Sequence, residues 1–294
     1  MNYNNILMPN LLDFLFEMNQ KGITKPLIIG GGLGLFLKQQ YITERNIRTL
    51  FDDPPFARST EDIDFFIPLE ILCQKEQCEK ILNVLELLGY EFIDKAKYMQ
   101  WEKPIQISDS QKGRVKIDWL TGQPDEQNKK YLHIKESRVR PKEKIEFHAH
   151  ITEEALFIED KKIDIPLVGR RTNNEEYETT IGIPHPFTYL LMKLFAYRDR
   201  RKDEKKFLGQ HHAFDVFKII ALLTENELDE TIQFGKRYAE NDIVRKARKI
   251  TQDYFNDLKS DGSNAIQTQK LFKNLADLEQ FLSVITDIFP AIPT

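Results

Sequence analysis

The chain has 294 residues, of which 41% are hydrophobic and 30% are charged, and its formal net charge is −4 at pH 7. This composition is that of a globular protein that can bury a core, in one large domain or in two. No apolar run approaches the roughly 20 residues of a membrane-spanning helix, so we expect no membrane segment. Two isolated cysteines, Cys73 and Cys78, match neither a zinc site nor a disulfide framework, and a cytoplasmic location is expected.

The first third of the chain alternates between expected helices and strands. An amphipathic N-terminal helix precedes a buried strand at 27–29. Three glycines follow at once, and then a helix over 33–40 and a proline-containing loop over 41–57. The second expected strand covers 62–67.

The middle of the chain is expected to be rich in strands. A long amphipathic helix over 69–88 ends at Gly89. Over 114–120, apolar and polar residues alternate, which is typical of a strand with one buried face. Further strands are expected over 90–93, 104–107, 145–151, 155–159 and 162–167, the last two forming a hairpin.

The pattern changes towards the C-terminus, where everything after Pro186 is expected to be helical. Glycines, asparagines and a proline gather in 168–185, so the change of structure falls there. We therefore expect an α+β fold: a mixed β-sheet flanked by helices in a domain over 1–180, followed by an all-helical domain over 181–294.

Two carboxylates alternate along the second expected strand. Successive side chains of a strand point to opposite faces, so Asp62 and Asp64 share one face, and Ile63 and Phe65 the other. Neighbouring carboxylates repel each other unless a cation lies between them, and hard oxygen ligands suit Mg²⁺. Taken alone, an Asp-x-Asp pattern more often marks two acids that face solvent.

A third carboxylate, Asp118, lies in the strand expected over 114–120 and shares a face with Lys116 and Leu120. It belongs either near the rim of the core or on an exposed edge strand. On a strand next to 62–67, it would complete a carboxylate set able to hold two metal ions for an in-line displacement.

The strand at 27–29 ends in Gly30, Gly31 and Gly32, which open a helix. Such a turn brings backbone N–H groups and the positive end of a helix close to a phosphate. The run is neither a Walker loop nor a dinucleotide-binding fingerprint. Tight packing of the strand against the helix explains the same glycines structurally.

Together these three elements resemble the signature of the DNA polymerase β-like nucleotidyltransferase superfamily. The chain is most similar to its AbiE-type abortive-infection toxins, in which a Gly-Gly turn is followed by Arg-x-Thr-x-Asp-x-Asp. Here that second motif begins at Arg58 and contains Thr60. A later helix with Lys193 and a following helix with Asp215 extend the resemblance over roughly 27–220.

The resemblance implies a nucleotidyltransferase fold that moves a nucleoside monophosphate from a nucleoside triphosphate to an acceptor hydroxyl. It implies Mg²⁺ or Mn²⁺ as cofactor and, in some relatives, tRNA as acceptor. A toxin of this kind also implies a separately encoded antitoxin. The residues that it assigns to metal binding are Asp62, Asp64 and Asp118; to nucleotide binding, Gly31, Gly32, Arg58, Thr60 and Lys193; and to catalysis, Asp62, Asp64, Asp118, Lys193 and Asp215.

The sequence leaves alternatives open for the acceptor molecule and for whether the chain is an active enzyme. Basic clusters at 135–144, 198–206 and 236–249 favour RNA, although such clusters are usually solvated, and a small antibiotic-like molecule is the other acceptor considered. Leu33 replaces a hydroxyl residue and His212 replaces an aspartate of the family pattern. Both departures leave room for a catalytically idle nucleotide- or partner-binding protein of the same fold.

Lys193 and Asp215 have two explanations each, and a histidine pair is a further candidate that we do not assign to catalysis. Lys193 lies at the margin of an apolar stripe, so it either extends to solvent or meets a buried anion. Asp215 either takes part in catalysis or pairs with the lysine three residues later on its helix. His148 and His150 share a strand face and could bind a metal, but a third ligand is not evident.

Overall fold

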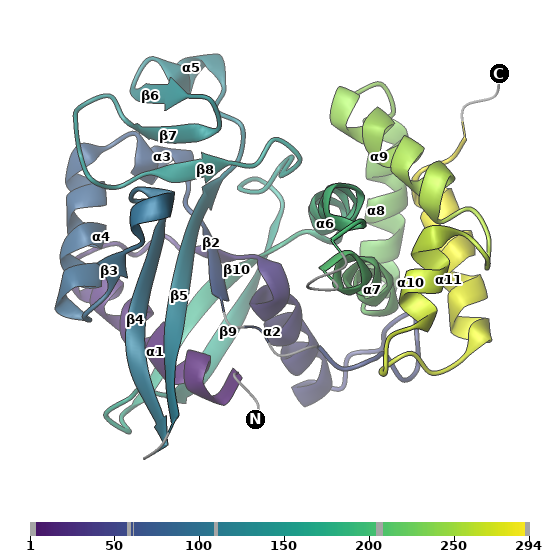
Figure 1. Ribbon diagram of the computed structural model, residues 1–294, viewed down its shortest axis with the longest axis horizontal. Helices are drawn as coiled ribbons and strands as arrows, with labels where there is room; N and C mark the ends of the chain where they lie inside the picture. The colour runs from purple at the N-terminus through teal and green to yellow at the C-terminus, as the bar shows by residue number, and fades with distance from the viewer. Residues whose placement is uncertain (1–3, 58–59, 61, 109–110, 204–207, 292–294) are drawn as a thin grey trace. The chain divides into compact units, whose positions relative to one another are not determined.

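The structure is a computed structural model that describes residues 4–57, 60, 62–108, 111–203 and 208–291 (Figure 1). The chain forms two compact units, each assembled from separated segments. One, the sheet unit, comprises Met1–Lys38, Arg58–Glu153 and Phe157–Pro184. The other, the helical unit, comprises Gln39–Ala57, Glu154–Leu156 and His185–Thr294.

The sheet unit is built on one mixed sheet with the strand order β6-β7-β8-β5-β2-β1-β10-β9. Outside this order, β4 pairs with β5, and β3 pairs with β4. The strands are β1 (Ile28–Ile29), β2 (Asp62–Phe66), β3 (Glu91–Phe92), β4 (Gln100–Ser108), β5 (Gln111–Thr121), β6 (Leu132–Lys135), β7 (Arg138–Pro141), β8 (Ala149–Ile151), β9 (Lys162–Arg170) and β10 (Glu176–Pro184). β5 runs parallel to β2 and to β8, and β1 runs parallel to β10, whereas the other pairs are antiparallel. The expected mixed sheet flanked by helices is therefore present.

The sheet unit also contains helices, the first of which packs on the apolar face of the sheet. They are α1 (Asn4–Gln20), α3 (Leu69–Leu72), α4 (Lys75–Leu87), the short α5 (Glu126–Lys129), the 3₁₀ turn η1 (Asp94–Ala96) and the first part of α2 (Gly31–Glu44). Phe14 of α1 packs on Phe65 and Trp119, with ring centroids 5.2 and 5.9 Å away. Because Phe65 and Trp119 belong to neighbouring strands, this aromatic cluster fixes β2 against β5.

The helical unit contains α6 (Pro186–Arg200), α7 (Leu208–Ala221), α8 (Glu225–Arg237), α9 (Asp242–Tyr254), α10 (Asp261–Gln267) and α11 (Leu275–Ile288). α6 and α7 pack against each other (Figure 1). A capping box of Thr224 and Glu227 starts α8, which explains the break in the helical pattern there. Phe51 from the 39–57 segment packs on Phe217 of α7, with centroids 5.4 Å apart.

Several expected elements differ from the structure. The helix expected over 69–88 is two helices, because the chain is not helical at Cys73 and Gln74. The strand expected over 155–159 was wrong: these residues form turns in which Ala155 and Ile158 are buried without strand pairing. β9 pairs instead with β10, a strand that the sequence pattern did not predict. β6 and β7 were also not predicted.

Cys73 and Cys78 are free thiols, the second of them fully buried on α4. In the parts of the chain that the structure describes, none of the helices is both long enough and apolar enough to span a bilayer.

Candidate functional site

The three carboxylates of the sequence pattern lie on one face of the parallel pair β2–β5. In the register of that pair, Asp64 lies opposite Asp118 and Asp62 lies opposite Lys116. Cross-strand partners share a face, and so do residues two apart on one strand. The expected shared face of Asp62 and Asp64 and the neighbouring position of Asp118 are therefore both present.

The alternation that creates this polar face also builds the core behind it. Ile63, Phe65, Ile117 and Trp119 point to the opposite face and are fully buried. The apolar residues thus fix the orientation of both strands, since a slip of one residue would bury the carboxylates.

A lysine lies among the carboxylates. The Nζ of Lys116 is 2.9 Å from Oδ1 of Asp118 and donates a hydrogen bond to its Oδ2 at 3.0 Å. The same Nζ lies 3.8 Å from Oδ2 of Asp62. Gln100, opposite Asp118 on β4, donates a further hydrogen bond to Oδ2 of Asp118 at 3.1 Å. The structure therefore places an ammonium group where neighbouring carboxylates require a positive charge.

Burial controls the electrostatics of this pair. The side chains of Lys116 and Asp118 are 20% and 18% exposed, whereas that of Asp62 is 45% exposed. Burial raises the pKa of Asp118, and the charge of Asp62 raises it further, while Lys116 and Gln100 oppose the rise. Burial lowers the pKa of Lys116, but Asp118, Asp62 and Asp64 outweigh it and the net shift is upward. Lys116 is therefore charged at neutral pH.

The glycines place Asp64 at the start of a helix. The backbone N–H of Gly30 donates to the backbone carbonyl of Asp64 at 2.8 Å, which holds the turn against β2. Gly31 opens α2 with φ at +60°, and a Cβ at that position would overlap with the carboxylate of Asp64. Glycine is therefore required at 31 by both conformation and space. Gly32 is buried in the first turn of the same helix.

The negative carboxylate of Asp64 thus lies at the positive end of α2, a favourable arrangement. The carboxylate of Asp64 therefore lies beside the position at which these glycines are expected to bind a phosphate. A phosphate there would have to share the helix terminus with this carboxylate, or bind together with a cation that compensates both charges.

The other residues implied by the resemblance lie in different surroundings. Thr60 is buried, and its hydroxyl donates a hydrogen bond to the carbonyl of Asp62 at 3.3 Å. Lys193 of α6 donates to Oδ2 of Asp215 of α7 at 2.8 Å inside the helical unit. These two side chains are 8% and 1% exposed, so the buried anion that Lys193 meets is Asp215. Arg58 lies outside the described residues.

His148 and His150 are on β8 and its approach, beside the end of β5. Burial and the nearby Arg138 and Arg140 lower the pKa of His148 to about 4. The partial burial of its ring also lowers the pKa of His150, whose side chain is otherwise exposed. Among the described residues, no group of three or more His, Cys, Asp or Glu side chains is gathered closely enough to hold a metal ion, which applies to these histidines and to the β2–β5 carboxylates alike.

Sequence reasoning did not assign Lys116 or Gln100 to the site. The signal for Lys116 was present, because it shares the strand face of Asp118 at a spacing of two residues. Gln100 had no such signal: its position depends on the register of β4 against β5, which the local pattern does not contain.

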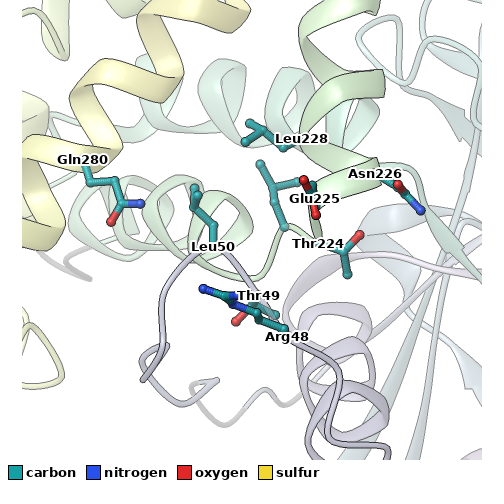
Figure 2. Close-up of a pocket in the computed structure, with 9 residues that line it drawn as sticks. Arg48, Thr49, Leu50, Thr224, Glu225, Asn226, Leu228 and Gln280 are labelled. Carbon is teal, nitrogen blue, oxygen red and sulfur yellow. The ribbon is translucent and has the colours of Figure 1, made fainter.

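A pocket of about 570 Å³ lies in the helical unit, between the loop at 48–50 and the start of α8 (Figure 2). Arg48 and Thr49 come from the loop, Glu225 and Asn226 from the first turn of α8, and Gln280 from α11. Its charged lining residues are one arginine and one glutamate, so it lacks the carboxylate set of the β2–β5 face.

No protein-family model, curated protein or solved structure matches this chain.

Proposed function

We propose that this chain is a nucleotidyltransferase that depends on a divalent metal and has the fold of the DNA polymerase β-like superfamily. It moves a nucleoside monophosphate from a nucleoside triphosphate to an acceptor hydroxyl, with RNA as the first choice of acceptor. The observation that carries the proposal is the placing of Asp62, Asp64 and Asp118 on one face of neighbouring parallel strands. The glycine-initiated α2 begins beside one of these carboxylates.

The donor atoms of this face are of the kind that binds Mg²⁺ or Mn²⁺, and the three carboxylates would have to move closer together to hold an ion. Asp62, Asp64 and Asp118 offer hard oxygen ligands, which both ions prefer. The ammonium of Lys116 already lies within 3.8 Å of two of them, which supports the need for a positive charge at this position. Metal binding there requires Lys116 to turn aside, since both cations compete for the same oxygens. A bound ion would neutralise the phosphates of the nucleotide.

The chain's own groups would contribute positioning and proton transfer. The backbone N–H groups at Gly31 and Gly32 would orient phosphate oxygens at the start of α2. The acceptor oxygen would form a bond to the α-phosphorus while the bond from that phosphorus to pyrophosphate breaks. Asp118 would take the acceptor's proton at a carboxylate oxygen, a role that its raised pKa favours.

The remaining residues belong to the proposal through the resemblance alone. Thr60 and Arg58 belong to the Arg-x-Thr motif that precedes the carboxylates. Lys193 and Asp215 pair with each other within the helical unit, and a role in transfer would require that pair to open. A toxin role and a cognate antitoxin likewise rest on the resemblance.

One observation favours a second candidate, a catalytically idle protein of the same fold. The repulsion among Asp62, Asp64 and Asp118 would argue against an idle site if nothing relieved it. Lys116 does relieve it, so the repulsion by itself does not require a metal ion.

A thermal-shift experiment separates the two candidates. The purified chain is heated with each nucleoside triphosphate, with Mg²⁺ or with a chelator. A nucleotide at about a hundred times its dissociation constant stabilises the folded state by about 2.7 kcal/mol. For a chain of 294 residues that unfolds in one step, that is a rise in Tm of about 4–5 °C.

The matched variant is Asp62→Asn with Asp64→Asn, which keeps the size of both side chains. A rise that requires Mg²⁺ and disappears in this variant supports the transferase. A chain that no nucleotide stabilises, with or without Mg²⁺, supports the idle protein instead.

A further inference from the structure

The sheet face that carries the carboxylates continues across β8, β7 and β6. Leu120, two residues beyond Asp118 on β5, lies opposite His150 of β8. His150 in turn lies opposite Arg138 of β7, and Arg138 lies opposite Lys135 of β6. Cross-strand partners share a face, so these side chains lie on the face of Asp118.

Basic and imidazole groups occupy this face on all three strands. Arg140 lies opposite His133 in the same hairpin, and both are two residues from members of the first row. The alternate residues Leu132, Val139 and Ala149 are buried behind them. We call the following residues the basic stripe: His133, Lys135, Arg138, Arg140, His148 and His150.

Among the residues that the structure describes, no acidic side chain forms an ion pair with the cations of the basic stripe. Within the described parts of the chain, Lys135 and Arg138 take part in no ion pair and no side-chain hydrogen bond. The Nη1 of Arg140 donates to the carbonyls of residues 141–143, which compensates no charge. By contrast, Arg114 near the other end of β5 is paired with Glu102. An uncompensated row of cations attracts phosphates.

We infer that the basic stripe binds the phosphate backbone of the acceptor RNA and directs its terminal hydroxyl towards Asp118; this inference rests on the proposed function. From β5 to β6 there are three strand spacings, or about 14 Å. The three cations lie on β6 and β7, and the imidazoles of β8 lie between them and β5. An extended polyanion can place its phosphates on these cations and continue across β8 to Asp118, whereas a single phosphate cannot span this distance. The carboxylates of β2 and β5 repel a phosphate backbone, so it is held on the neighbouring strands.

Flat side chains accompany the cations. His133 and His150 are exposed, and Tyr131, at the start of the same hairpin, is 53% exposed. Proteins that bind single-stranded nucleic acids combine a basic track with rings on which bases stack. An acidic protein could also pair with these cations. It would not explain the exposed rings or the neighbouring carboxylates, so the arrangement favours RNA.

Fluorescence anisotropy with a labelled single-stranded RNA, without metal or nucleotide, tests the inference. The variant is Lys135→Gln with Arg138→Gln in the full chain, and it leaves Arg140 and its carbonyl bonds intact. The control, Lys21→Gln with Lys80→Gln, also removes two positive charges. Lys21 follows α1 and Lys80 lies on α4, so neither belongs to the strands β6–β8. Circular dichroism confirms that each variant is folded.

The expected result is a weaker salt dependence. Each phosphate contact to a single strand contributes about −0.7 to the slope of log affinity against log salt. Between about 50 and about 200 mM salt, the wild-type affinity should therefore fall about 7-fold more than that of the Lys135/Arg138 variant. The control variant should behave like the wild type.

Two results would overturn the inference. One is an equal affinity and salt slope in the Lys135/Arg138 variant and the wild type; the other is a wild type that does not bind RNA at all. In either case, nucleotide stabilisation in the thermal-shift experiment shows that the transferase proposal survives. If RNA binds through the stripe and no nucleotide does, the transferase proposal fails alone.

Discussion

Replacing Lys116 by methionine removes the ammonium and keeps most of the side-chain volume. The substitution leaves Asp118, 18% exposed, without its closest cation and beside Asp62 and Asp64. Removing one partner of a buried ion pair costs about 3–5 kcal/mol. Because this pair is about one-fifth exposed, solvent screening reduces the cost, and we expect a loss of about 2–4 kcal/mol at pH 7.

The loss should depend on pH with a definite sign. The folded-state pKa of Asp118 is already raised, and removal of Lys116 raises it further. A carboxyl whose pKa is raised on folding adds stability as the pH falls from its folded-state pKa towards the unfolded value of about 3.9. The difference between the variant and the wild type should therefore shrink over that acidic range.

Urea unfolding followed by tryptophan fluorescence measures this difference, because Trp119 lies in the core behind the pair. A second variant, Lys116→Met with Asp118→Asn, removes both charges and should recover most of the loss. Mg²⁺ should stabilise the single variant more than the wild type, since no ammonium competes with it. A single variant within about 1 kcal/mol of wild type, or a double variant no better than the single, would refute the reasoning.

Three other predictions use the same kind of unfolding or titration measurement. Gly31→Ala forces a residue with a side chain into the left-handed region, and its Cβ against the carboxylate of Asp64. The free energy of unfolding in urea should fall by at least about 1–3 kcal/mol. An unchanged unfolding midpoint would contradict that contact. Asp215→Asn leaves the buried ammonium of Lys193 without its carboxylate and should lower the free energy of unfolding by about 3–5 kcal/mol. A loss below about 1 kcal/mol would mean that the pair does not form in solution. His148 should remain neutral in NMR titrations down to about pH 4. Its folded-state pKa lies below the unfolded value of about 6.5, so its contribution to stability should be lost as the pH falls between those values, and a normal titration midpoint would show that it is not buried as described.

The strands that carry the carboxylates were predictable because one of their faces is apolar. Ile63 with Phe65, and Ile117 with Trp119, produce a period of two that survives in the sequence alone. The shared face of the carboxylates follows from the same period. Their contact with Lys116 does not, because it requires the register of β2 against β5, two strands far apart in the chain.

The hairpin β6–β7 was missed for a reason of turn chemistry. Lys135 pairs with Arg138, so the loop has two residues, and its first, Glu136, has a φ of +56°. Two-residue hairpin turns usually contain asparagine or glycine, which tolerate a positive φ, and these residues allow the turn to be predicted. Glutamate gives no such signal, and the basic residues at alternate positions resemble a solvated segment. The features that hid the hairpin are the ones on which the RNA inference depends.

β10 was missed because its first half is polar and partly exposed at 176–180, and only its second half is buried. The strand expected over 155–159 failed in the opposite way. Its apolar residues are buried by packing of a turn, so they do not indicate strand pairing. Hydrophobic residues by themselves indicate burial. The spacing at which they recur along the chain is needed to distinguish a strand from a helix or a turn.

The membership of Gln39–Ala57 in the helical unit has a consequence for synthesis on the ribosome. This segment leaves the ribosome early, but Leu50 and Phe51 donate backbone hydrogen bonds to the carbonyls of Leu223 and Ala221. Contacts between residues so distant in sequence form slowly, because a long loop must close first. Until α7 has been made, Phe51 lacks its aromatic neighbour Phe217, and the nascent chain exposes an apolar segment that a chaperone could hold.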